Sequence, residues 1–162
     1  ARVIAVASGD AKLAAATAAG AGLAIDHRST DFVAATMDAT AGRGVDVVYD
    51  PVGGELFTTS LRSIAFEGRI LIIGFASGTV PQIPANHLLV KNVDVIGLNW
   101  PAYAELNPLV MTESFTILLQ WYATGAIRPH ISALYPLEQT VEALRQVIAR
   151  KSTGKVVITV SP

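Results

Sequence analysis

The chain has 162 residues, of which 51% are hydrophobic and 15% charged, so it can bury a core and is not intrinsically disordered. Its formal net charge of -1 offers no basic surface for nucleic acid or an anionic membrane, and no apolar run is long enough to span a bilayer. Cysteine is absent and the three histidines lie far apart, which excludes disulfides, a thiol nucleophile and a local metal motif within these residues. Because the chain opens with Ala1 rather than Met, we expect either that a segment has been removed before it or that it is a piece of a longer polypeptide.

Short apolar runs alternate with helical segments along the chain. Runs rich in β-branched residues predict strands at Val3–Ala7, Gly22–Ile25, Val45–Tyr49, Arg69–Phe75, Val93–Leu98 and Gly154–Val160. Helices are predicted at Ala11–Ala19, Thr30–Thr40, Glu55–Ala65, Leu109–Ala123 and Leu137–Arg150, with loop or extended chain at Ala76–Leu89 and Ile127–Tyr135. Nearly continuous apolar strands joined by helices are typical of a parallel sheet covered on both faces, so the predicted class is doubly wound α/β.

The last predicted helix is amphipathic. Its apolar side chains Val141, Leu144, Val147 and Ile148 recur at helical spacing, and we expect them to share one face.

The first strand end carries the clearest functional signal. Ligands of open parallel sheets bind at the carboxyl ends of the strands. Gly9 allows close backbone approach there, and Lys12 lies in the first helical turn, where the helix dipole disfavours a cation. A cation beside free helix amides predicts an anion site that includes Ser8. The alternative is a solvated lysine partly balanced by Asp10.

The same strand end lacks a carboxylate. NAD enzymes usually place Asp or Glu at this point to bind the ribose hydroxyls, whereas this strand ends in Ala7 and Ser8. The position therefore leaves room for a 2′-phosphate, with Ser8 and Lys12 as donors. The alternative is that a rotation of the loop places the carboxylate of Asp10 at this position.

The other strand ends carry weaker signals. His27 can stack on a purine or donate to a phosphate, and Val52 offers an apolar wall for a flat ring. The glycine-rich exit at residues 74–78 allows close approach of a planar ligand, and Trp100 is as consistent with a core as with a ligand contact. For each, a plain surface or turn residue remains the alternative. No G-x-G-x-x-G turn occurs in the sequence.

The order of these segments resembles a known family. RVIAVASGDAKL, GAGLAIDHR, GVDVVYDPVGG, GRILIIGFASG and the closing GKVVITV resemble the nucleotide-binding half of the zinc-independent quinone oxidoreductases, in the medium-chain dehydrogenase/reductase superfamily. The resemblance implies a Rossmann-type sheet of order 3-2-1-4-5-6 that here lacks its first strand, glycine-rich turn and first helix. It also implies a partial NADP-binding domain at residues 1–125, and a segment at 126–162 that returns to a catalytic domain outside this chain.

The resemblance further implies an activity and its contacts. The expected reaction is hydride transfer from NADP(H) to a quinone, with an enoyl or alkenal reductase, or a catalytically silent α/β interaction module, as alternatives. The expected cofactor contacts are Ser8, Gly9, Lys12, His27, Val52, Gly74, Phe75, Ala76, Ser77, Leu98, Asn99, Trp100 and Arg150. We assign no catalytic residue and no metal ligand within the chain. We also expect a cytoplasmic homodimer that pairs through the edge of the strand at Val93–Leu98.

Overall fold

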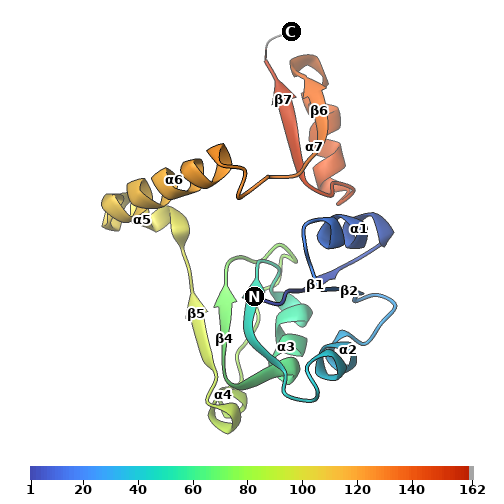
Figure 1. The fold of residues 1–162 in the computed structure, drawn as a ribbon, viewed down its shortest axis with the longest axis vertical. Helices are drawn as coiled ribbons and strands as arrows, with labels where there is room; N and C mark the ends of the chain where they lie inside the picture. Colours follow the sequence, from blue (N-terminus) through green and yellow to red (C-terminus); the bar gives the residue numbers. More distant parts are fainter. Residues whose placement is uncertain (161–162) are drawn as a thin grey trace. The chain divides into compact units, whose positions relative to one another are not determined.

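The structure is a computed structural model that describes residues 1–160. It falls into two compact units, which divide between Ala102 and Tyr103 (Figure 1). Each unit is α/β in its own right, and each is described by itself. The sequence prediction placed a functional boundary at residue 125, and that boundary stays a prediction.

The first unit begins with a small parallel sheet. Strand β1 (Ile4–Ala7) pairs in register with β2 (Leu23–Asp26), so that Ala7 lies opposite Asp26. Helix α1 (Asp10–Ala18) connects the two strands, as a parallel pair requires. Helix α2 (Phe32–Ala39) follows β2 and begins at Asp31, whose side chain caps it.

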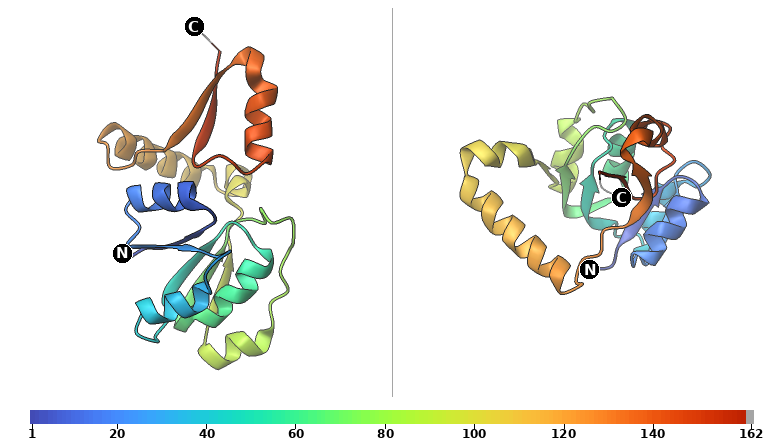
Figure 2. Two further views of the ribbon diagram at one scale, coloured as in Figure 1. Left: turned by 90° about the vertical axis from the view of Figure 1, so that its right-hand side faces the viewer. Right: turned by 90° about the horizontal axis from the view of Figure 1, so that it is seen from above.

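A second parallel sheet completes this unit. Its strands are β3 (Val45–Asp50), β4 (Ile64–Ile72) and β5 (Asp94–Gly97), in the order β3-β4-β5. Its helices are α3 (Gly54–Ser63) and α4 (Ala85–Lys91), and the short η1 (Trp100–Ala102) ends the unit. Helix α3 lies alongside the sheet with α2 next to it (Figures 1 and 2).

The strand order matches the predicted Rossmann topology. All strand pairs are parallel, and within the described residues β1 pairs with β2 alone while β3 pairs with β4 alone. Inserting one strand between β1 and β3 would give the six-stranded order 3-2-1-4-5-6 of a doubly wound sheet. The predicted fold class is therefore confirmed.

The core of the first unit lies between α3 and the three-stranded sheet. Its buried side chains are Phe57, Leu61, Ile64, Ile70 and Val93. Phe57 and Leu61 come from one face of α3, and Ile64 and Ile70 come from β4, which is the central strand of its sheet. This packing fixes the carboxyl ends of β3 and β4 relative to each other.

Two predictions of local structure were wrong. The segment predicted as loop contains helix α4, which Asn92 ends in a left-handed conformation with φ of 51°. The predicted helix at Glu55–Ala65 ends at Ser63, and β4 already begins at Ile64. The ladder between β3 and β4 shifts register between Val45 and Val47, which accommodates this early start.

The second unit has a helical part and a small α/β part. The helical part is α5 (Tyr103–Leu106) and α6 (Pro108–Ala123). The α/β part consists of β6 (Ile131–Pro136), η2 (Leu137–Gln139), α7 (Thr140–Ile148) and β7 (Lys155–Thr159), in which β6 and β7 pair in parallel. The segment predicted as loop or extended chain is thus partly a strand.

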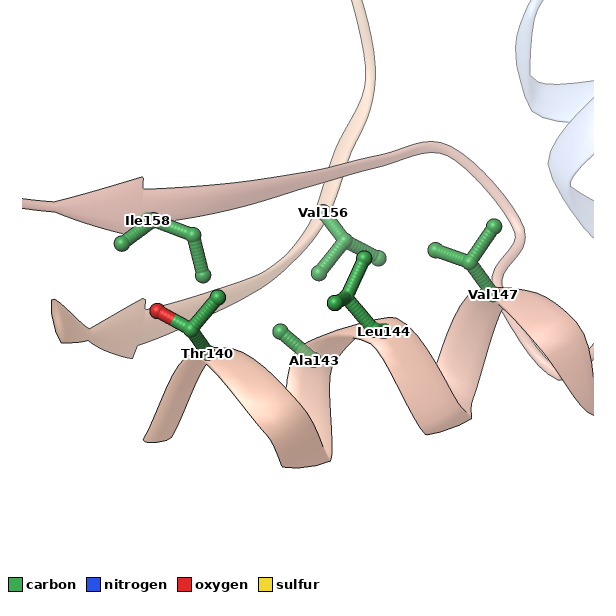
Figure 3. Close-up of a pocket in the computed structure, with 6 residues that line it drawn as sticks. All are labelled: Thr140, Ala143, Leu144, Val147, Val156 and Ile158. Carbon is green, nitrogen blue, oxygen red and sulfur yellow. The ribbon is translucent and has the colours of Figure 1, made fainter. Parts of the chain in front are cut away.

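Helix α7 packs against β7 through part of the predicted face. Leu144 and Val147 line a shallow apolar hollow together with Ala143, against Val156 and Ile158 of β7 (Figure 3). Leu144 and Val147 are still 57% and 50% exposed, and Val141 and Ile148, predicted on the same face, are 59% and 79% exposed. Ala143 is buried, and its small side chain lets the helix approach the sheet closely.

Candidate functional site

The carboxyl end of β1 has a backbone that only glycine readily adopts. Gly9 has φ of 82° and ψ of 148°, a region that L side chains essentially never occupy. A Cβ added at Gly9 would find nothing within 4 Å, so the space beside this backbone is open. Helix α1 begins at the next residue and Gly9 supplies no side-chain cap. The loop therefore presents an exposed backbone at a helix start.

A carboxylate from the neighbouring strand holds this loop. Asp26 ends β2, and its Oδ2 accepts a hydrogen bond of 3.0 Å from the Gly9 amide. Its Oδ1 accepts one of 2.9 Å from the Arg28 amide. The Arg28 and Gly9 amides, together with the charges of His27 and Arg28, hold the pKa of Asp26 below its ordinary value. Asp26 is therefore ionised at neutral pH and ties the two strand ends together.

The cationic side chain at this end is unpaired. Lys12 is half-buried in the first turn of α1, and within residues 1–160 its ammonium makes no ion pair, with Asp10 or with any other acid. His27 is half-buried, and its amide donates to the carbonyl of Ala7 at 3.1 Å. The structure thus brings Ser8, Gly9, Lys12 and His27 to the joined ends of β1 and β2, an arrangement that suits an anion.

The ends of β3 and β4 are joined by main-chain hydrogen bonds. The Ile73 amide donates to Asp50, the Ala76 amide to Pro51 and the Ser77 amide to Val52, over 2.9, 3.1 and 3.0 Å. The Gly54 amide donates to Thr79 at 3.0 Å. The turn after β3 and the loop after β4 are therefore one connected layer at the edge of the sheet.

Asp50 organises the turn after β3. It is 6% exposed, and its Oδ1 accepts from the amides of Val52 and Gly53 at 2.8 and 2.9 Å. Its Oδ2 is buried and has no hydrogen-bond partner within residues 1–160. A buried carboxylate oxygen that lacks a donor costs free energy, so this edge retains the capacity to accept one more hydrogen bond.

Close packing shapes the surface of the same layer. A Cβ on Gly53 would lie 2.8 Å from the Phe75 ring, and one on Gly54 would lie 2.8 Å from the Ser77 hydroxyl. The Ser77 hydroxyl donates to the Thr79 carbonyl and accepts from the Thr79 amide, so it is used within its own turn. Val52 is half-buried and Phe75 is 41% exposed, which gives the layer an apolar surface.

The remaining predicted contacts lie at two further places. Leu98, Asn99 and Trp100 follow β5, where the Leu98 amide donates to Ile72 at 3.0 Å and continues the ladder. Arg150 follows α7 in the second unit, with φ of 55°. The strand-end positions of twelve predicted residues agree with the topology, while their contacts with a cofactor, and that of Arg150, stay predictions.

Sequence reasoning missed two carboxylates. Asp26 and Asp50 were assigned no role, although each ends a strand and precedes a turn residue. An acid as the last residue of an apolar strand is a usable signal, because its side chain reaches the amides of the following turn. The register of β1 with β2 decides which strand end Asp26 reaches, and this register cannot be read from the sequence.

The sequence matches a family model described as zinc-binding dehydrogenase over residues 19–158. It is 42% identical over 158 residues to the Bos taurus quinone oxidoreductase-like protein 2, covering 98% of this chain and 45% of that protein. A Pseudomonas syringae quinone oxidoreductase structure matches with a TM-score of 0.81 and 30% identity, over 98% of this chain and 49% of that one. A mycobacterial protein complexed with NADPH matches with a TM-score of 0.86 and 28% identity, over 98% and 50%. The chain thus spans about half the length of the relatives it matches.

The family's name implies a metal, and the residues present do not fit one. Within residues 1–160 no three His, Asp or Glu side chains are grouped so that they could hold a metal ion, and the chain has no cysteine. No helix in the same residues combines the length and apolarity needed to cross a bilayer.

The sequence match and the parallel fold together identify the family. The chain belongs to the medium-chain dehydrogenase/reductase superfamily, in which it corresponds to the nucleotide-binding portion of the quinone oxidoreductase-like members.

Proposed function

We propose that this chain is the NADPH-binding portion of an oxidoreductase that transfers a hydride to a quinone. The observation that carries the proposal is the end of β1, where an open glycine backbone, a helix start and the unpaired ammonium of Lys12 come together. The family supports it, because a relative is named a quinone oxidoreductase-like protein, one similar structure is a quinone oxidoreductase, and another is complexed with NADPH.

The cofactor preference follows from the charges at this strand end. Lys12 is a donor for a 2′-phosphate, and the half-buried Ser8 adds a hydroxyl. The nearby carboxylate of Asp26 is already engaged by two backbone amides, so it does not take the place of the acid that binds a ribose hydroxyl pair in NAD enzymes. These features favour NADPH over NADH.

The connected layer formed by the turn after β3 and the loop after β4 suits the nicotinamide half of the cofactor. Val52 and Phe75 offer apolar surface for a flat ring, and the glycines at 74 and 78 allow its close approach. Bound NADPH supplies the hydride, and with one proton it converts a quinone to a hydroquinone and leaves NADP⁺. The part of this chain is to bind and orient the cofactor, and Arg150 is proposed as one further contact.

Replacing Lys12 tests the proposal in the longer protein that contains this chain. We expect Lys12→Ala to lower kcat/KM for NADPH by about 10- to 100-fold and to leave the value for NADH nearly unchanged, since a charged hydrogen bond is lost only with the phosphate. Lys12→Arg keeps the charge and should retain most of the activity. Lys155→Ala, an exposed lysine of the second unit, is the control.

Three outcomes would contradict the proposal. Equal losses with NADPH and NADH in Lys12→Ala would remove the phosphate role. Enone reduction without quinone reduction by the wild-type protein would favour the enoyl or alkenal reductase, and no oxidation of either nucleotide with either substrate would favour the silent module.

A further inference from the structure

We propose that Asp26 is a positioning residue for the adenosine end of the cofactor. The proposal rests on the proposed function and deepens it, because it names the group that sets the shape of the binding loop. The observation is that one carboxylate on β2 bonds the amide of Gly9, a residue 17 positions away at the end of β1. Asp26 thus acts on the neighbouring strand end as well as on its own turn.

The backbone geometry of Gly9 makes the loop depend on its hydrogen bond to Asp26. With φ of 82° and ψ of 148°, Gly9 occupies a region that only glycine populates, and nothing within 4 Å restrains it from the side where a Cβ would lie. A loop of this kind has many accessible conformations. The hydrogen bond to Asp26 fixes the orientation of the Ser8–Gly9 peptide, from which the chain enters α1.

The start of α1 sets the position of Lys12. The Lys12 and Leu13 amides both donate to the Gly9 carbonyl, at 3.1 and 3.2 Å, so the first turn is built directly on Gly9. This carbonyl belongs to the Gly9–Asp10 peptide, which follows the peptide held by Asp26. A change in the backbone angles of Gly9 between the two peptides would move the first turn of α1 and the ammonium of Lys12 with it. Asp26 does not need to touch the cofactor in order to determine where the phosphate-binding cation stands.

The bond also decides which groups remain for the ligand. Because the Gly9 amide donates to Asp26, it is not available to a phosphate. The Arg28 amide is likewise engaged by Oδ1. With these two amides engaged, the side chains of Ser8, Lys12 and His27 are the groups that would distinguish a nucleotide with a 2′-phosphate from one without it. Asp26 in this way makes the loop selective.

The chain offers a matched control in Asp31. Its Oδ1 also accepts two backbone hydrogen bonds, from Val33 and Ala34 at 3.0 and 3.2 Å, yet both belong to the helix that Asp31 itself caps. Asp26→Ala and Asp31→Ala therefore each remove an acid and two amide contacts. Only Asp26→Ala removes a contact with the end of β1.

The test compares both variants in the longer protein that contains this chain, with NADPH and NADH as probes. We expect Asp26→Ala to raise the KM for NADPH about tenfold, with kcat nearly unchanged, and to lower the NADPH-to-NADH preference. Asp26→Asn, which keeps one acceptor oxygen, should fall between wild type and Ala. Asp31→Ala should lower the melting temperature without moving either KM.

Each outcome decides the matter. Equal KM changes in Asp26→Ala and Asp31→Ala would mean a merely structural role and would overturn this inference while leaving the proposed function standing. If Asp26→Ala does not fold, Asp26→Asn replaces it in the same comparison, and a wild-type NADPH preference in that variant would overturn the inference. A wild-type protein that binds neither nucleotide in a fluorescence titration would overturn both proposals.

Discussion

At the scale of single residues, two glycines in the layer above β3 and β4 are held for different reasons. Gly53 has φ of 68° and ψ of -155°, and a Cβ there would lie 2.8 Å from the Phe75 ring and 3.1 Å from the Thr79 carbonyl. Gly78 has φ of 83°, but a Cβ there would meet nothing within 4 Å. Both positions are strained for other residues, and Gly53 is crowded as well.

This pair separates backbone strain from steric conflict. We expect Gly78→Ala to cost about 1–2 kcal/mol of the free energy of unfolding, from the left-handed backbone alone. Gly53→Ala should cost more, about 2–4 kcal/mol, because the loop after β4 must also move. Urea denaturation of both variants measures the difference. Equal costs would mean that the layer yields freely and that the contact with Phe75 carries no stability.

Some residues of the candidate site could be predicted from the sequence and others could not. The glycines and Lys12 could be predicted from sequence because a glycine or a helix-start cation is unusual by itself. For Asp26 and Asp50 the sequence signals only that an acid at a strand end can reach the amides of the next turn. What distinguishes them is a partner across a strand pair for Asp26 and deep burial for Asp50, and both arise only from tertiary structure.

At the scale of elements, Lys91 links two helices of the first unit. Its ammonium lies at the end of α4 and donates to the carbonyls of Arg62 and Ile64, at 3.2 and 2.9 Å. These carbonyls lie where α3 ends and β4 begins. A cation at a helix C-terminus also complements the helix dipole. The lysine therefore secures the abrupt change from helix to strand at Ser63.

Removing this ammonium should destabilise the unit. We expect Lys91→Met, which keeps the apolar stem, to lower the free energy of unfolding by about 1–3 kcal/mol, since two carbonyls lose a charged donor. Lys151→Met is the control, because within residues 1–160 the Lys151 ammonium has no such bond. Thermal unfolding followed by circular dichroism measures both. A Lys91 variant as stable as the control would show that solvent replaces the link.

Helix α4 was not predicted because the sequence around it has the features of a loop. Pro81 and Pro84 make the segment before it read as loop, and the helix has only seven residues. Asn92 was the available signal, since asparagine often ends a helix in the left-handed conformation. Most strands were predictable because their runs are apolar and rich in β-branched residues, whereas β6 was predicted only as loop or extended chain. The early start of β4 was not, because Gly68 resembles a turn but lies inside a strand whose ladder shifts register.

At the scale of the whole molecule, β5 lies at the end of its sheet. It pairs with β4 on one side, and in the described residues no strand lies on its other side. Ile96 and Leu98 are 42% and 39% exposed there. An edge of this kind pairs readily with an identical edge. We keep the proposal that the complete protein is a homodimer joined at this strand.

A charge on the edge tests the dimer. In the longer protein, Ile96→Lys should raise the dimer dissociation constant by about tenfold or more, because two like charges meet at a symmetric edge. Val80→Lys, an exposed change in a loop away from β5, should leave it unchanged. Analytical ultracentrifugation measures both. A wild-type monomer at high concentration would contradict the proposal outright.

The separation of the two sheets in the first unit affects how it unfolds. Cooperativity in a sheet passes through its ladder, and among residues 1–160 no ladder bond joins β1 to β3. The buried cluster around Phe57 belongs to the three-stranded sheet, so we expect the β1–β2 pair to open as a separate foldon, with faster amide hydrogen exchange. A strand seated between the two edges would merge both foldons into one cooperative unit, so nucleotide affinity and global stability would rise together.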